Sequence, residues 1–118
     1  MFRFTSDAKV YLHREPVDFR KQIDGLAVLV SASMALDPMR EALFVFTNRR
    51  KDRIKILWWD RTGFCLWLKR LEKDRFTWPG RTADEVVALD SEHLHWLLEG
   101  FDVFRSPPHQ RLEYGAVI

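Results

Sequence analysis

One short stretch of the chain combines residue types that bind nucleic acids. The sequence FVFTNRRKDRIKILWWDRTG, residues 44–63, places a run of arginine and lysine beside two adjacent tryptophans. Guanidinium and ammonium groups neutralise phosphates, and aromatic rings stack on bases. The stretch therefore favours a surface that contacts nucleic acid, provided that the fold holds both kinds of group within reach of one ligand.

The cations are densest in NRRKDR, residues 48–53, which is expected to connect two strands. Adjacent cations repel one another, and exposed charges contribute little to stability. Such cations form stronger interactions where they bind phosphate. We therefore predict that Arg49, Arg50, Lys51 and Arg53 contact phosphate, whereas the alternative is a solvated loop without a partner.

Alternation along a strand sends neighbouring side chains to opposite sides of the sheet. Arg53, Lys55 and Trp59 share one side of their strand, and Trp67 and Lys69 share one side of the next. If these sides coincide, one sheet face carries all five. The alternative is that both tryptophans pack under the C-terminal helix, with the lysine stems along its edge. The predicted nucleic-acid-binding residues are Arg49, Arg50, Lys51, Arg53, Lys55, Trp59, Arg61, Trp67, Lys69 and Arg70.

The sequence offers no catalytic or metal-binding pattern. His93 and His95 are two positions apart, which turns them to different faces of a helix. Cys65 lies in a predicted strand, where nothing activates its thiol. The aspartates are explained as a cap, a helix surface residue, a loop residue and a turn residue, namely Asp18, Asp24, Asp52 and Asp60. We expect no catalytic residue, metal or cofactor, and a metal-dependent nuclease is the least favoured function.

The elements that position these residues follow from hydrophobic periodicity and turn signals. Apolar residues at three- and four-residue steps predict a helix that Asp18 caps and that ends before Pro38. Strands are expected over 9–13, 42–48, 53–60, 64–71, 75–79 and 85–89, and a helix over 92–99. We predict an α+β fold, in which an antiparallel β-sheet meander carries one long helix and a shorter C-terminal helix.

The length of 118 residues suits one domain, residues 1–118, that buries a core without disulfides or a structural metal.

Residues 47–81 hold eleven Lys or Arg against four Asp or Glu, whereas residues 82–102 hold six acidic residues and no Lys or Arg. An anion-binding face is one interpretation of this segregation. The other is that the acidic, partly helical segment folds back and neutralises the basic one. Residues 103–118 are expected to be irregular.

The chain lacks the apolar segments that membrane proteins need. No apolar run approaches the roughly 20 residues that span a bilayer, and the N-terminal sequence MFRFTSDAKVYLHREP has charges where a signal peptide is apolar. Cys65 is the only cysteine, which fits a reducing compartment. We expect a cytoplasmic protein with no membrane partner.

Two longer motifs carry a family resemblance. The order PVDFRKQIDGL, then LFVFTNRRKDRIKILWWDRTGFCLWLKRLEKDRFTWP, closely resembles TnpB, the second-open-reading-frame accessory protein of bacterial insertion sequences of the sixty-six class. It does not resemble the RNA-guided nuclease of the same name. The match spans about residues 10–80, and Phe19, Trp58 and Leu68 depart from the family pattern only within residue class. The family motif residues are Asp18, Arg20, Lys21, Asp24, Gly25, Asn48, Asp60 and Gly63.

The resemblance implies a mobile-element protein that assists transposition beside a separate transposase, which carries the catalytic carboxylates. It implies no chemistry of its own and supplies no active site. We therefore predict a non-enzymatic accessory protein that contacts DNA with low sequence specificity and works with the transposase. The alternative is an adapter whose aromatic face docks on the transposase or on a second copy of itself, without direct DNA binding.

Overall fold

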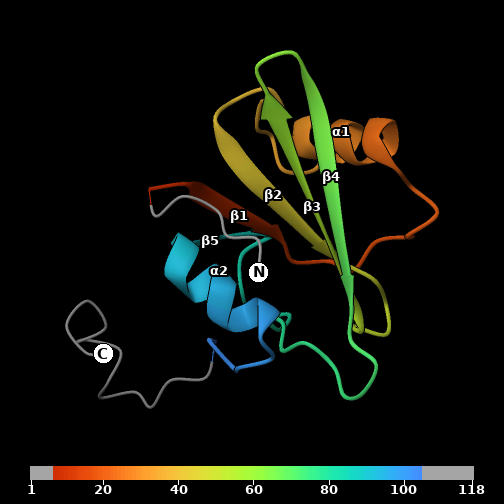
Figure 1. The fold of residues 1–118 in the computed structure, drawn as a ribbon, viewed down its shortest axis with the longest axis vertical. Coiled ribbons are helices and arrows are strands. Elements are labelled where there is room, and N and C mark those ends of the chain that lie inside the picture. Colours follow the sequence, from red (N-terminus) through yellow and green to blue (C-terminus); the bar gives the residue numbers. More distant parts are fainter. Residues whose placement is uncertain (1–6, 105–118) are drawn as a thin grey trace.

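The computed structural model describes residues 7–104, in which one helix packs against each face of a five-stranded sheet (Figure 1). The sheet order is β4-β3-β2-β1-β5. In chain order the elements are β1 (Lys9–His13), α1 (Ile23–Ala32), β2 (Ala42–Thr47), β3 (Arg53–Asp60), β4 (Gly63–Arg70), β5 (Val86–Leu89) and α2 (Ser91–Leu98).

The sheet is mixed, which corrects the predicted antiparallel meander. Strands β2, β3 and β4 do form an antiparallel meander, and β5 is antiparallel to β1. However, β1 is parallel to β2, and α1 is the crossover that connects them. Parallel neighbours require such a crossover. Periodicity predicts where strands lie, but the partner of each strand depends on how the connections cross the sheet.

The first helix is shorter than predicted, because α1 has ten residues and does not begin at Asp18. The backbone carbonyl groups of the residues before α1 accept hydrogen bonds from a side chain and make no helical hydrogen bonds. The Lys55 ammonium donates to the carbonyl oxygens of Phe19 at 3.0 Å and Lys21 at 2.8 Å. Asp18 is therefore no helix cap, and its carboxylate accepts the backbone N–H of Arg20 at 2.9 Å.

The strand predicted over residues 75–79 is absent from the structure. This segment is instead held by single hydrogen bonds to different parts of the molecule. The backbone N–H of Phe76 donates to the Lys51 carbonyl at 2.8 Å, and the Trp78 indole N–H donates to the Arg14 carbonyl at 2.9 Å. Isolated hydrogen bonds of this kind do not form a strand ladder. The prediction from strand-forming residue types is therefore wrong for this segment.

The shorter C-terminal helix is confirmed as α2. Asp90 caps it by accepting the backbone N–H of His93 at 2.8 Å. Gly100 follows its end with a φ of 98°, which glycine adopts without steric cost. Lys69 of β4 donates from Nζ to the Leu98 carbonyl at 2.7 Å, so a cation meets the negative end of the helix. Of the tail predicted to be irregular, residues 105–118 lie outside the described residues.

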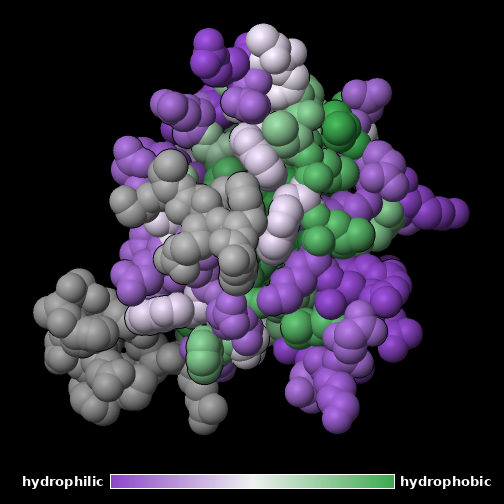
Figure 2. Space-filling view, viewed as in Figure 1, coloured by the Kyte–Doolittle hydropathy of each residue, from purple (hydrophilic) through white to green (hydrophobic). Residues whose placement is uncertain are grey.

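Each face of the sheet buries its own core. All six residues of β2 are buried, as expected of a central strand that is covered on both sides. Seen from the α2 side, apolar surface gathers over the β3–β4 hairpin (Figure 2). Neither helix of the described chain is long and apolar enough to cross a membrane. The core toward α2 comprises Val10, Leu12, Leu43, Val45, Ile54, Ile56, Phe76, Leu94, Leu97 and Leu98. The core toward α1 comprises Leu26, Val30, Met34, Ala42, Phe44, Phe46 and Leu57.

Candidate nucleic-acid interface

Two motif segments that are distant in sequence meet at one end of the sheet. Residues 16–20, which follow β1, and residues 48–53, which connect β2 to β3, line a cleft of ≈580 Å³. The Val17 N–H donates to the Thr47 carbonyl at 2.8 Å, and this bond holds the two segments together. The charged residues that line the cleft are Arg20, Arg49, Arg50, Arg53 and Asp18.

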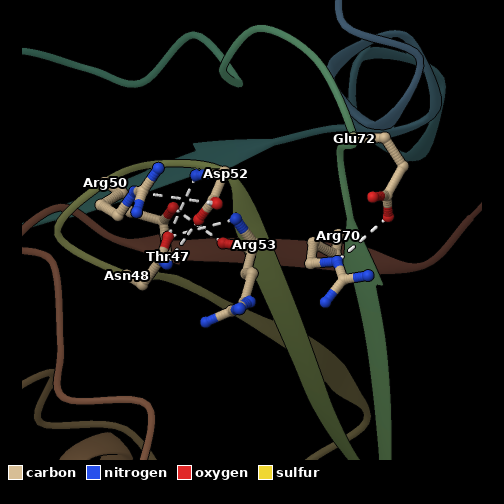
Figure 3. A network of polar contacts seen from close by, with 7 residues as sticks. All are labelled: Thr47, Asn48, Arg50, Asp52, Arg53, Arg70 and Glu72. Atoms are coloured by element: carbon tan, nitrogen blue, oxygen red, sulfur yellow. Dashed lines mark hydrogen bonds and ion pairs between the residues drawn. The ribbon is translucent and has the colours of Figure 1, made fainter.

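The β2–β3 loop is organised by Asn48. Its side-chain carbonyl accepts the backbone N–H groups of Asp52 and Arg53, each at 3.1 Å, and its amide donates to the Asp52 carboxylate at 2.7 Å (Figure 3). The Asn48 backbone carbonyl accepts the Lys51 N–H at 3.0 Å. With the turn closed in this way, the Arg50 side chain extends into solvent and is 80% exposed. The loop therefore presents exposed cations on a hydrogen-bonded backbone.

Asp52 reduces the positive charge of the loop without cancelling it. The hydrogen bond from Asn48 holds the pKa of Asp52 below its ordinary value, and the cations of Arg53 and Arg50 add to this effect. The carboxylate is thus ionised at neutral pH, and it lies 4.0 Å from the Arg50 Nε. One carboxylate against several adjacent cations leaves an excess of positive charge, which suits a polyanion.

Asp18 and Arg20 form the other wall of the cleft. Arg20 donates from Nε to one carboxylate oxygen of Asp18 at 3.1 Å and from Nη2 to the other at 2.6 Å. This hydrogen-bonded pair lowers the pKa of Asp18 to about 2. Because Asp18 neutralises Arg20, the net positive charge of the cleft comes from the β2–β3 loop.

A second hollow of ≈760 Å³ continues along β4 and shares Phe19 and Arg53 with the cleft. Arg53 lies opposite Arg70 in the β3–β4 ladder, and both side chains point to the same side of the sheet (Figure 3). Arg70 also donates to the Glu72 carboxylate at 3.0 Å. Together the cleft and the hollow make a continuous concave surface with arginines along it.

Lys55 lies in the wall of this second hollow, but its ammonium group has a structural role, because it donates hydrogen bonds to the backbone before α1. The residue is 4% exposed, and burial lowers the pKa of its ammonium. Besides its bonds to the carbonyls of Phe19 and Lys21, Nζ lies 4.8 Å from the centroid of the Phe19 ring. Lys55 therefore anchors the segment before α1 and is not free to meet a phosphate. Its burial has no signal in the sequence.

The expected face with both tryptophans and the cations does not form. The β3–β4 register pairs Trp59 with Phe64 and Ile56 with Trp67, so the two tryptophans project from opposite faces. Trp67 packs beside the core under α2, whereas the alternative predicted this position for both tryptophans. The ring of Trp59 instead makes an edge contact with Phe64, with centroids 5.0 Å apart. Lys69 shares the Trp67 face, whereas Arg53 and Lys55 share the Trp59 face.

Arg61 lies in the β3–β4 turn, at the opposite end of β3 from the cleft. The acidic segment meets the basic one where Lys69 donates to the Leu98 carbonyl, but it does not cover the loop of residues 48–53. Four ion pairs within residues 7–104 are local in sequence, and α2 packs on the sheet face opposite the cleft. These pairs are Arg20–Asp18, Arg50–Asp52, Arg70–Glu72 and His93–Asp90.

Within residues 7–104, no group of three or more His, Cys, Asp or Glu side chains is placed to hold a metal ion. His93 contacts Asp90 through Nδ1 at 2.7 Å, and His95 contacts the Ser91 carbonyl at 2.8 Å. Cys65 is a free, half-buried thiol on β4.

The remaining family motif residues have local structural roles. Gly25 leaves room for the chain before α1, since a Cβ there would lie 3.2 Å from the Cβ of Lys21. Asp24 lies in the first turn of α1. Asp60 and Gly63 are the last pair of the β3–β4 ladder and flank its turn. Asp60 and Gly63 thus lie at the end of β3 opposite the cleft, whereas Asn48 lines the cleft from within the β2–β3 loop.

Comparison with known proteins adds a family context to this geometry. The family described as IS66 Orf2 like protein matches residues 8–107. An uncharacterized protein of Sinorhizobium fredii, y4jC, is 33% identical over 94 residues, which cover 80% of this chain and 80% of that protein. A second uncharacterized protein of the same organism, y4hO, is 33% identical over 96 residues, covering 81% and 83%. No solved structure matches the chain.

Proposed function

The chain belongs to the IS66 Orf2-like family, and from this premise we propose that it is a non-enzymatic accessory protein of insertion-sequence transposition that contacts DNA directly. It works beside the transposase of the same element, in the cytoplasm. The observation that carries the DNA contact is the cationic cleft between residues 16–20 and residues 48–53.

The cleft suits a phosphate backbone. Arg49, Arg50 and Arg53 line it, and a guanidinium can donate two parallel hydrogen bonds to one phosphate. Asn48 already holds the loop in shape, so binding does not have to order the backbone. Lys51 belongs to the same loop and adds charge at its tip. Arg70 extends the cationic surface along β4.

Low sequence specificity follows from the same geometry. Phosphate contacts fix the position of a protein on DNA but carry no sequence information directly. A stacking platform for bases would need exposed rings beside the arginines, whereas Trp67 packs next to the core under α2 on the other face. We therefore propose that arginine-phosphate contacts provide most of the affinity.

The carboxylates also support a role without catalysis. Asp18 is held by Arg20, and Asp52 is held by Asn48. Both carboxylates thus have structural partners within the cleft, where a nuclease would need carboxylates directed at a metal or a water molecule.

The test removes charge from the loop and measures salt dependence. Replacing Arg49 and Arg50 with Gln should lower the slope of log affinity against log salt by roughly one to two units on duplex DNA, because each phosphate contact contributes about 0.9. The melting temperature should change little, since exposed charges contribute little to stability.

The matched control removes two exposed cations at the other end of the sheet. Lys9→Gln with Arg40→Gln changes the net charge equally, but neither residue lines the cleft. Its slope should stay close to that of the wild type. If Arg49→Gln with Arg50→Gln also keeps the wild-type slope while remaining folded, the loop does not bind phosphate and the adapter function becomes the better explanation.

A further inference from the structure

The two edges of the sheet differ in how they are protected. The edge strand β5 has four residues and is flanked by Glu85 and Asp90. The other edge strand, β4, has eight residues, and within residues 7–104 no strand pairs with its outer side. Soluble proteins protect free edges with short strands, charges, prolines or bulges. Residues 63–68 of β4 contain no charge and no proline, so this edge is a ready template for another strand.

The register shows which backbone groups of β4 are free. A two-residue turn joins Asp60 to Gly63, so these two residues form a hydrogen-bonded pair, and such pairs then alternate along the ladder. The Leu71 N–H donates to the Asp52 carbonyl at 2.8 Å, which continues the same alternation beyond the other end. The residues whose N–H and C=O groups point away from β3 are therefore Phe64, Leu66, Leu68 and Arg70.

The same part of β4 carries apolar side chains that the fold does not fully cover. Phe64 and Leu66 are half-buried beside the core under α1, and Leu68 is 55% exposed. On the other face, Cys65 and Trp67 are half-buried. Figure 2, from the α2 side, shows apolar surface over the β3–β4 hairpin. Free backbone groups and uncovered apolar groups thus occur on one strand.

We propose that β4 pairs antiparallel with β4 of a second copy of this chain, so that the two sheets become continuous. The two-fold axis is perpendicular to the sheet and passes beside Leu66, which lies opposite Leu66 of the partner subunit. Phe64 then lies opposite Leu68 of the partner subunit, and Cys65 lies opposite Trp67 of the partner subunit. Each α1 remains on the same side of the combined sheet.

A second copy fits this edge because the strand is complementary to itself. Antiparallel pairing about Leu66 places an apolar residue opposite every apolar residue from Phe64 to Leu68. The cations Lys69 and Arg70 lie opposite Gly63 and Thr62 of the partner subunit, so no like charges face each other. The backbone hydrogen bonds can also form across this interface. Phe64, Leu66 and Leu68 all point their N–H and C=O groups away from β3, and each lies opposite one of these residues in the partner subunit.

The test is the association state of the protein without DNA, measured by sedimentation equilibrium over a range of concentrations. We expect a reversible dimer. Leu68→Lys introduces two cations into each dimer at the new interface and should raise the dissociation constant at least about tenfold. The control is Val28→Lys, because Val28 is 62% exposed on α1 and belongs to neither core. This control should leave the dissociation constant unchanged.

Hydrogen exchange of the Leu66 amide gives an independent result if Leu68→Lys fails to fold. This amide points outward, so it should be protected in the wild type and should lose protection on dilution. A monomer at all concentrations, with an unprotected Leu66 amide, overturns the proposal. Protection that appears only after transposase is added also overturns it, and assigns the edge to a strand of that partner. Neither measurement uses DNA, so a failure of the phosphate contacts does not affect them.

Discussion

Replacing Asn48 with Ala tests whether a single side chain organises the cationic loop. Asn48 is 8% exposed, and its side-chain carbonyl accepts the backbone N–H groups of Asp52 and Arg53, each at 3.1 Å. A hydrogen bond between neutral groups contributes about 0.5–1.5 kcal/mol net, so two such bonds predict a loss of about 1–3 kcal/mol in the free energy of unfolding. The bond to the Asp52 carboxylate is left out of this sum, because water can replace that partner.

Urea unfolding followed by tryptophan fluorescence measures the loss. The midpoint should fall while the m-value stays constant, since the surface exposed on unfolding hardly changes. The same variant should bind duplex DNA more weakly but with an unchanged salt slope. The salt slope is unchanged because all the arginines remain and make the same phosphate contacts. The affinity falls because binding must now also order the loop.

The matched variant Asn48→Asp keeps the shape and the acceptor but puts a second carboxylate where the amide now lies, 2.7 Å from the Asp52 carboxylate. Repulsion between the two groups raises their folded-state pKa values. The variant should therefore be destabilised at neutral pH and should regain stability as the pH falls. A loss below about 0.5 kcal/mol in Asn48→Ala, or full stability of Asn48→Asp at neutral pH, would refute the role assigned to Asn48.

Three further predictions test other contacts. Lys55→Met should lower the free energy of unfolding by about 1–3 kcal/mol, because two backbone carbonyls before α1 lose their donor, and a urea titration that shows no loss would contradict the anchoring role. The folded-state pKa of Asp18 is about 2 against an ordinary value of 3.8, so its contribution to stability is present above about pH 3.8 and is lost as the pH falls toward 2. Asp18→Asn should therefore flatten the fall in melting temperature over that range, and an identical fall in both proteins would refute this assignment. Trp67→Ala should cost about 3 kcal/mol and Trp59→Ala clearly less, because only Trp67 packs beside a core, and equal midpoints in urea would contradict this difference.

The sequence by itself determined the elements whose signals are local. The strands over residues 9–13 and 53–60 are found with the predicted bounds, because apolar alternation and turn residues act within a few positions. The helix predicted over residues 92–99 is found as α2, which Asp90 caps, since a cap needs only the next three residues. The family resemblance also came from the sequence, because long motifs need no knowledge of the fold.

The tertiary structure decided whatever depends on partners that are distant in the chain. Alternation assigned sides within each strand, but the β3–β4 register placed Trp59 and Trp67 on opposite faces. The predicted helix start failed because Lys55, far along the chain, takes the carbonyl of Lys21. The cleft exists because the crossover through α1 sets β1 parallel to β2. Both strands therefore end at the same end of the sheet, where the segments that follow them line the cleft. Local patterns fix which segments are strands and helices, whereas pairing and register depend on long-range contacts that a single sequence does not display.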